Sequence, residues 1–209
     1  MAYPISFLLC TGNVNKSQEF SKIIDNKYPV FIVEPKFEPI EPQTWDKMEL
    51  INYKLDQATK ATKDNIGDLQ NSYLVVEDVS FYVNFKDDSD KCLPGPFIKY
   101  FIEAMNLNDF LKMYPPKSEA MEYVVYAAEH IISKQRFYGI GIRSGILDVI
   151  DGKNGFGYDP IFYVKNNHDD YVSVASLSSE DKNKFSGRAL AIKNLVQNIE
   201  QNLRRFKSS

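Results

Sequence analysis

The stretch "EYVVYAAEHIISKQRFYGIGI", residues 122–142, predicts a long β-hairpin that turns near Lys134 and Gln135. Two apolar arms flank a short polar segment, which is the usual pattern of a hairpin. Further strands are expected at 5–10, 30–34 and 146–150, and two more runs lie around Glu77 and Asp78 in "YLVVEDVSFYVNF". Because helices alternate with these strands, we expect an α/β protein with a mixed sheet.

Five helices are expected between the strands. Residues 15–26 place Phe20, Ile23 and Ile24 on one face. Asp46 and Glu49 form a capping-box pattern that opens a second helix. Its inner stripe is expected to contain Met48, Ile51, Leu55, Ala58 and Thr62. Pro94 and Pro96 precede a third helix over Phe97–Met105, and Ser178 and Ser179 cap a short fourth. The last helix is expected to bury Ile192, Leu195, Val196, Ile199 and Leu203.

Length and composition restrict the function classes. A chain of 209 residues with 44% hydrophobic and 25% charged residues suits one domain, or one domain split into two lobes. The net charge of −3 argues against a nucleic-acid partner. No basic N-terminal region or membrane-length apolar run is present, so no signal peptide or membrane partner is expected. Cys10 and Cys92 are expected to be reduced thiols of a cytoplasmic protein.

A polar segment follows the first expected strand. "TGNVNK" places Thr11, Gly12, Asn13 and Lys16 between a strand end and a helix start, where unpaired N–H groups suit an anion. The segment lacks the Walker A pattern. A plain strand–turn–helix joint explains it equally well.

Two adjacent carboxylates, Glu77 and Asp78, come directly after an apolar run. Adjacent strand residues point to opposite faces, but at a strand end both can reach a cleft rim. Their oxygens would suit Mg²⁺, and Glu41 would be a further carboxylate. The alternatives are a solvated strand end for the pair and a plain surface residue for Glu41.

The stretch "GKNGFGYDPIF", residues 152–162, fits neither a surface turn nor a core strand, because two aromatic residues flank a glycine before Asp159. "SEDKNKFSGR" adds Lys182, Ser186 and Arg188, for which a solvated charged face is the alternative. His130 and His168 stand far apart in the sequence, and they suggest no Ser–His–Asp arrangement.

Together these segments resemble the inosine triphosphate pyrophosphatase family, in its eukaryotic branch. The similar segments are "TGNVNK", "VVEDVS", "LPGPFIKYF", "FGYDPIF" and "SEDKNKFSGRAL". They occur in the family's order across most of the chain. The resemblance implies an elongated mixed sheet with flanking helices in two lobes, an active-site cleft between the lobes, and one pyrophosphatase domain over residues 1–209. A homodimer is also implied.

The implied activity is hydrolysis of inosine, deoxyinosine and xanthosine triphosphates to the monophosphate and pyrophosphate, which cleanses the nucleotide pool. Glu41 and Glu77 would hold Mg²⁺, Asp78 would be the general base, and Lys16 would assist catalysis. Phe156 would stack on the base and Asp159 would address its polar edge. The implied substrate-binding residues are Thr11, Gly12, Asn13, Lys16, Lys54, Asp78, Val79, Lys99, Phe156, Gly157, Tyr158, Asp159, Lys182, Ser186 and Arg188.

Two positions differ from the family pattern. Gly187 stands where the family has a histidine, and Val79 stands where it has threonine or serine, although Ser80 follows. Two alternatives therefore remain open. One is the same chemistry on a pyrimidine or modified base, and the other is a nucleotide-binding protein that does not cleave.

Overall fold

The predicted hairpin forms two neighbouring strands of one sheet, β5 (Glu119–His130) and β6 (Arg136–Leu147). The computed structural model describes residues 5–11, 14–33, 41–62, 71–86, 91–155, 157–166, 168–178, 180–182 and 186–207. Within these residues, eight strands form the sheet. Its order is β2-β1-β3-β5-β6-β7-β8, and β4 pairs with β3 outside this path.

The sheet is mixed, as the sequence predicted. Strand β1 (Ser6–Cys10) runs parallel to β2 (Val30–Val33) and to β3 (Ser72–Val83). The antiparallel pairs are β3 with β4 (Pro94–Gly95), β6 with β7 (Phe162–Lys165), and β7 with β8 (Tyr171–Ser173). The helices are α1 (Val14–Ile23), α2 (Lys47–Thr62), α3 (Ile98–Ala104), α4 (Leu107–Lys112) and α6 (Gly187–Lys207), with short 3₁₀ turns η1 (Asp159–Ile161) and η2 (Val174–Ser176).

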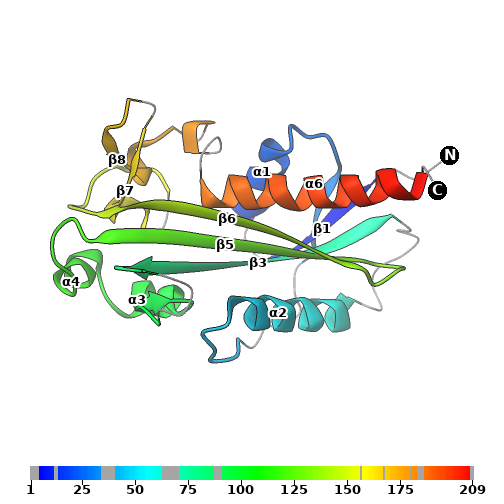
Figure 1. Cartoon of the computed structure of the whole chain (residues 1–209), viewed down its shortest axis with the longest axis horizontal. Helices are drawn as coiled ribbons and strands as arrows, with labels where there is room; N and C mark the ends of the chain where they lie inside the picture. Colours follow the sequence, from blue (N-terminus) through cyan, green and yellow to red (C-terminus); the bar gives the residue numbers. More distant parts are fainter. Residues whose placement is uncertain are drawn as a thin grey trace. The chain divides into compact units, whose positions relative to one another are not determined.

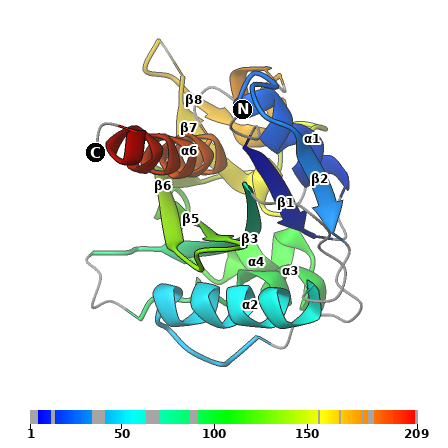
Figure 2. The same ribbon diagram turned by 90° about the vertical axis from the view of Figure 1, so that its right-hand side faces the viewer.

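The chain divides into two compact units. Unit 1 comprises residues 1–78, 125–141 and 188–209, and unit 2 comprises residues 79–124 and 142–187. In unit 1, helix α2 lies on one side of the strands, and α1 and α6 lie on the other (Figures 1 and 2). Helix α6 approaches β6 closely at Gly139, where an added Cβ would collide with the Ala191 carbonyl and Leu195.

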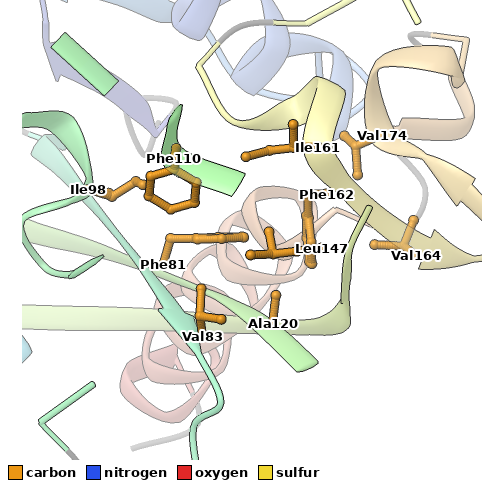
Figure 3. Close-up of a cluster of buried hydrophobic side chains, with 10 residues drawn as sticks. All are labelled: Phe81, Val83, Ile98, Phe110, Ala120, Leu147, Ile161, Phe162, Val164 and Val174. Atoms are coloured by element: carbon orange, nitrogen blue, oxygen red, sulfur yellow. The ribbon is translucent and has the colours of Figure 1, made fainter. Parts of the chain in front are cut away.

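Unit 2 has its own hydrophobic core, drawn in Figure 3. The ring of Phe81, from β3, packs edge-on against Phe162 of β7, with 5.1 Å between ring centroids. Helices α3 and α4 add Ile98 and Phe110, and the remaining members are Val83, Ala120, Leu147, Ile161, Val164 and Val174.

Most of the expected helices form. Asp46 Oδ1 accepts hydrogen bonds from the N–H groups of Met48 and Glu49 at 2.8 and 3.1 Å, so the predicted cap of α2 is present. The Glu49 carboxylate, however, accepts from Thr44 Oγ1 at 2.6 Å. In the inner stripe, Leu50 is buried whereas Met48 is half-buried.

Two expectations were wrong in detail. The strand expected at 146–150 ends at Leu147, where Val149 and Ile150 become exposed. The two runs of "YLVVEDVSFYVNF" form one uninterrupted strand, β3.

None of the helices in the described ranges has the length and apolar character that crossing a bilayer requires. Cys10 and Cys92 are both free thiols.

Candidate active site

The acidic pair of β3 is divided between two ion-pair networks of unit 1. Glu77 Oε1 accepts hydrogen bonds from Arg188 Nε and Nη2 at 3.1 and 2.9 Å. Its other oxygen accepts from the Tyr126 hydroxyl at 3.0 Å and lies 3.5 Å from Lys16 Nζ. Arg188 also donates to Glu19 at 2.8 Å. Helix α6 is therefore tied to β3 and to α1 through one guanidinium group.

Glu77 is held as a carboxylate. Its side chain is only 4% exposed, and this burial alone would raise its pKa. The charges of Arg188 and Lys16, with hydrogen bonds from Arg188 and Tyr126, outweigh burial and lower the pKa of Glu77 to about 2.

Asp78 belongs to the second network. Lys54 Nζ, from α2, donates to Asp78 Oδ1 and to Glu41 Oε1, each at 3.0 Å. All three side chains are less than 20% exposed. Two carboxylates therefore share one buried ammonium group, which leaves this cluster with a net negative charge.

The second oxygen of Asp78 has a different environment. Asp78 Oδ2 is buried and accepts no hydrogen bond from the described residues. Burial raises the pKa of Asp78 to about 6, with the charges of Glu41 and Glu77 adding to it, and Lys54 only partly offsets the rise. The adjacent carboxylates thus have pKa values shifted in opposite directions, which is common in catalytic pairs.

A hard cation fits the second network better than the first. Among the described residues, no group of three or more His, Cys, Asp or Glu side chains could hold a metal ion. Glu41 and Asp78 nevertheless face one cationic group, and Asp78 Oδ2 is an acceptor without a protein donor. Both oxygens of Glu77 already face cationic or hydroxyl donors. The metal role of Glu77 stays a prediction.

A third network lies in unit 2. Asp159 and Lys182 form an ion pair at 2.7 Å, with side chains 8% and 14% exposed. The resemblance implied that Asp159 addresses the base and that Lys182 binds substrate, and the structure pairs the two directly. The ring of Tyr158 stacks on Phe81 with 4.2 Å between centroids, and its hydroxyl donates to Glu122 at 2.8 Å.

Gly155 has a structural reason for lacking a side chain. Its φ is +88°, and an added Cβ would collide with the Asp159 carboxylate. The missing side chain at Gly155 therefore makes room for Asp159. Gly157 has φ +62° and no atom within 4 Å of an added Cβ, so its space is open among the described residues.

The other predicted residues lie at varied depths. Thr11 and Val79 are half-buried, Ser186 is buried, and Lys99 is exposed on α3. Ser80, proposed as a substitute hydroxyl for Val79, is buried and its Oγ has no partner among the described residues. Gly12, Asn13 and Phe156 lie outside the described residues.

Sequence reasoning missed Tyr126, Glu19 and Glu122. Tyr126 carried a usable signal, because a tyrosine in an apolar strand normally needs a hydrogen-bond partner for its hydroxyl. Glu19 stands three residues after Lys16, a spacing that places two helical residues on one face and that could have indicated it. Glu122 had no comparable signal, since its partners Tyr158 and Gly187 are distant in the sequence.

Solved structures share this mixed α/β fold. A Ham1 protein from Staphylococcus aureus matches with a TM-score of 0.62 at 22% identity, covering 95% of this chain and 98% of that one. A HAM1 protein from Coxiella burnetii matches with a TM-score of 0.63 at 20% identity, covering 94% and 99%. These matches show that the chain is an α/β protein with the fold of the Ham1 proteins.

Sequence comparison defines the family. The Ham1 family model matches residues 7–198, and this chain belongs to that family. A Kluyveromyces lactis relative named inosine triphosphate pyrophosphatase is 30% identical over 189 residues, 90% of this chain and 92% of its own. A Saccharolobus solfataricus relative named dITP/XTP pyrophosphatase is 26% identical over 192 residues, 91% of each chain. The resemblance read from the motifs is confirmed.

Proposed function

We propose that this protein hydrolyses non-standard purine nucleoside triphosphates, those of inosine, deoxyinosine and xanthosine, to the monophosphate and pyrophosphate. The names of its Ham1 relatives support this substrate class. The observation that carries the proposal is the buried Asp78 carboxylate, which has one oxygen held by Lys54 and the other without a protein donor.

In the proposed reaction, a water oxygen attacks the α-phosphorus of the triphosphate. The bond from that phosphorus to the α,β-bridging oxygen breaks, and pyrophosphate leaves with the bonding electron pair. Asp78 Oδ2 accepts the proton of the attacking water. A pKa of about 6 suits this role, because the group is then ionised at neutral pH yet remains a usable base.

Lys54 and Lys16 are the proposed phosphate ligands of unit 1. Each now faces carboxylates: Lys54 faces Glu41 and Asp78, and Lys16 faces Glu77. Phosphate oxygens would compete with these carboxylates for the ammonium groups. Glu41 would then hold Mg²⁺, which would neutralise phosphate charge. Glu77 would keep Arg188 and Lys16 in place.

The test measures pyrophosphate and orthophosphate released from a panel of purine and pyrimidine triphosphates with Mg²⁺. We expect pyrophosphate, with inosine and xanthosine triphosphates as the best substrates. Asp78→Asn should lower kcat by about two to four orders of magnitude, the usual contribution of a general base. The surface variant Asp25→Asn is the matched control, and it should keep full activity.

Each alternative has its own result in this assay. A pyrimidine triphosphate as the best substrate would support the same chemistry on another base. Tight nucleotide binding without pyrophosphate release would indicate a binding protein. Release of orthophosphate alone would contradict attack at the α-phosphorus. Location in the cytoplasm and assembly as a homodimer stay predictions of the family resemblance.

A further inference from the structure

Glu122 links two of the segments expected at the nucleobase. Its Oε1 accepts the hydroxyl proton of Tyr158 at 2.8 Å, and its Oε2 accepts the N–H of Gly187 at 2.9 Å. Gly187 is the first residue of α6, where the N-terminal end of the helix favours a negative charge.

Arg143 supplies an unpaired donor on the neighbouring strand. Its Nη1 is buried and makes no hydrogen bond with the described residues. A buried donor without a partner costs about 1–3 kcal/mol, so each such group in a folded protein calls for an explanation, such as strain, a catalytic role, or a bound water or ion. Hydrogen bonds from the Leu147 N–H to the Ser118 carbonyl and from the His130 N–H to the Gln135 carbonyl, both 2.9 Å long, set a register of β5 and β6 that places Arg143 directly across from Glu122. Burial lowers the pKa of Arg143, and the charge of Glu122 opposes this shift.

Strand alternation places these side chains on one face. On β5, Glu122 shares a face with Ala120, and on β6, Arg143 shares a face with Leu147. Ala120 and Leu147 are both members of the unit 2 core with Phe81, which stacks on Tyr158. Glu122, Arg143 and Tyr158 therefore meet on the core side of the sheet within unit 2.

We propose that Glu122 and Arg143 are specificity-determining residues that read the six-membered-ring edge of a 6-oxopurine. This inference rests on the proposed function and on the expectation, from the family resemblance, that Tyr158 belongs to the substrate site. A carboxylate only accepts hydrogen bonds and a guanidinium only donates them. The pair thus offers an acceptor beside a donor.

Purine chemistry makes this pair selective. Hypoxanthine and xanthine present an N1–H donor beside the O6 acceptor, which complements Glu122 and Arg143. Adenine presents an amino donor beside the N1 acceptor, which is the reverse order. Binding adenine in the same pose would oppose donor to donor and acceptor to acceptor. Each mismatch of this kind changes relative affinity by about tenfold or more.

The experiment compares kcat/KM for inosine and adenosine triphosphates in the wild type and in Glu122→Gln and Arg143→Met. Glu119→Gln is the matched control, because it alters an exposed carboxylate elsewhere on the same strand. Thermal unfolding shows whether each variant is folded, and Arg143→Lys replaces Arg143→Met if the latter is not. Calorimetric binding of inosine and adenosine monophosphates gives a measurement that does not depend on turnover.

We expect each variant to lower the inosine-to-adenosine ratio by about tenfold or more in both assays, while Glu119→Gln leaves it unchanged. A purely structural role would instead reduce activity on both substrates equally. An unchanged ratio in both variants, or equal binding of the two monophosphates by the wild type, would overturn the inference. A wild type that binds inosine monophosphate selectively but cleaves no triphosphate would contradict only the proposed function.

Discussion

The raised pKa that suits Asp78 to the proposed role of general base also makes the folded protein less stable at neutral pH. Its raised pKa means that the folded protein binds a proton at this carboxyl more tightly than the unfolded chain does. Stability from this group is therefore fully present below the unfolded value of 3.8 and is lost as the pH rises through about 6. Glu77, with its lowered pKa, contributes in the opposite sense, and its contribution is lost only as the pH falls below 4.5 toward 2.

This difference predicts the effect of Asp78→Asn on metal-free protein. At pH 7.5 the variant should be more stable than the wild type, by up to about 3 kcal/mol, because it lacks a buried charge. The advantage should shrink as the pH falls below about 6 and should be lost near 3.8. Urea unfolding across this pH range measures it. Equal stability of the two proteins at pH 7.5 would show that Lys54 fully compensates the Asp78 charge.

At the scale of elements, the close packing of helix α6 against β6 requires a glycine at position 139. Gly139→Ala should destabilise the protein by about 1–3 kcal/mol or more, because the new methyl group would collide with the backbone of α6. The expected change appears as a lower midpoint of thermal unfolding. Ser144→Ala, at an exposed position on the same strand, is the control and should unfold like the wild type.

The contact of α6 with β3 is a buried ion pair. Arg188→Met should destabilise unit 1 by about 3–5 kcal/mol, because Glu77 would lose its main counter-charge while remaining buried. Adding Glu77→Gln should restore most of the loss, since the pair is then removed as a whole. Urea unfolding of the wild type, the two single variants and the double variant gives a double-mutant cycle, which measures the coupling between Arg188 and Glu77. Additive losses would mean that the two residues act independently.

Local signals explain which elements could be predicted from the sequence. The hairpin arms and the stripe of α2 have strong periodicity, and Asp46 supplies a clear helix start. Helix α4 has only six residues, and β7 and β8 have four and three, too few for a periodic pattern. The strand expected through Ile150 failed because the run is apolar but leaves the sheet after Leu147.

The candidate residues could be named from the sequence, whereas most of their contacts could not. Short motifs identified Glu77, Asp78 and Lys182. Their partners come from elements distant in sequence, such as Arg188, which is 111 residues after Glu77. The division of the acidic pair into two networks follows from strand alternation combined with the helices on each side, and the latter information is tertiary.

At the scale of the whole molecule, ligand binding should be visible in global stability. A non-hydrolysable α,β-methylene analogue of inosine triphosphate with Mg²⁺, at 100 times its Kd, should stabilise the fold by about 2.7 kcal/mol. For a chain of this length, the unfolding midpoint should rise by about 5–10 °C. Excess chelator should abolish most of this rise. An equal rise with and without chelator would argue against a metal-assisted site.

The position of Arg188 in the chain also has a consequence for biosynthesis. During translation, β3 leaves the ribosome long before the residue that neutralises Glu77, because 111 residues separate the two. Until Arg188 emerges, burying Glu77 would cost free energy, and α1 has no guanidinium to hold Glu19. Strand β3 is therefore expected to dock last. A ribosome-bound chain stalled before Arg188 should be cut rapidly by protease near residue 77, and one stalled beyond α6 should resist.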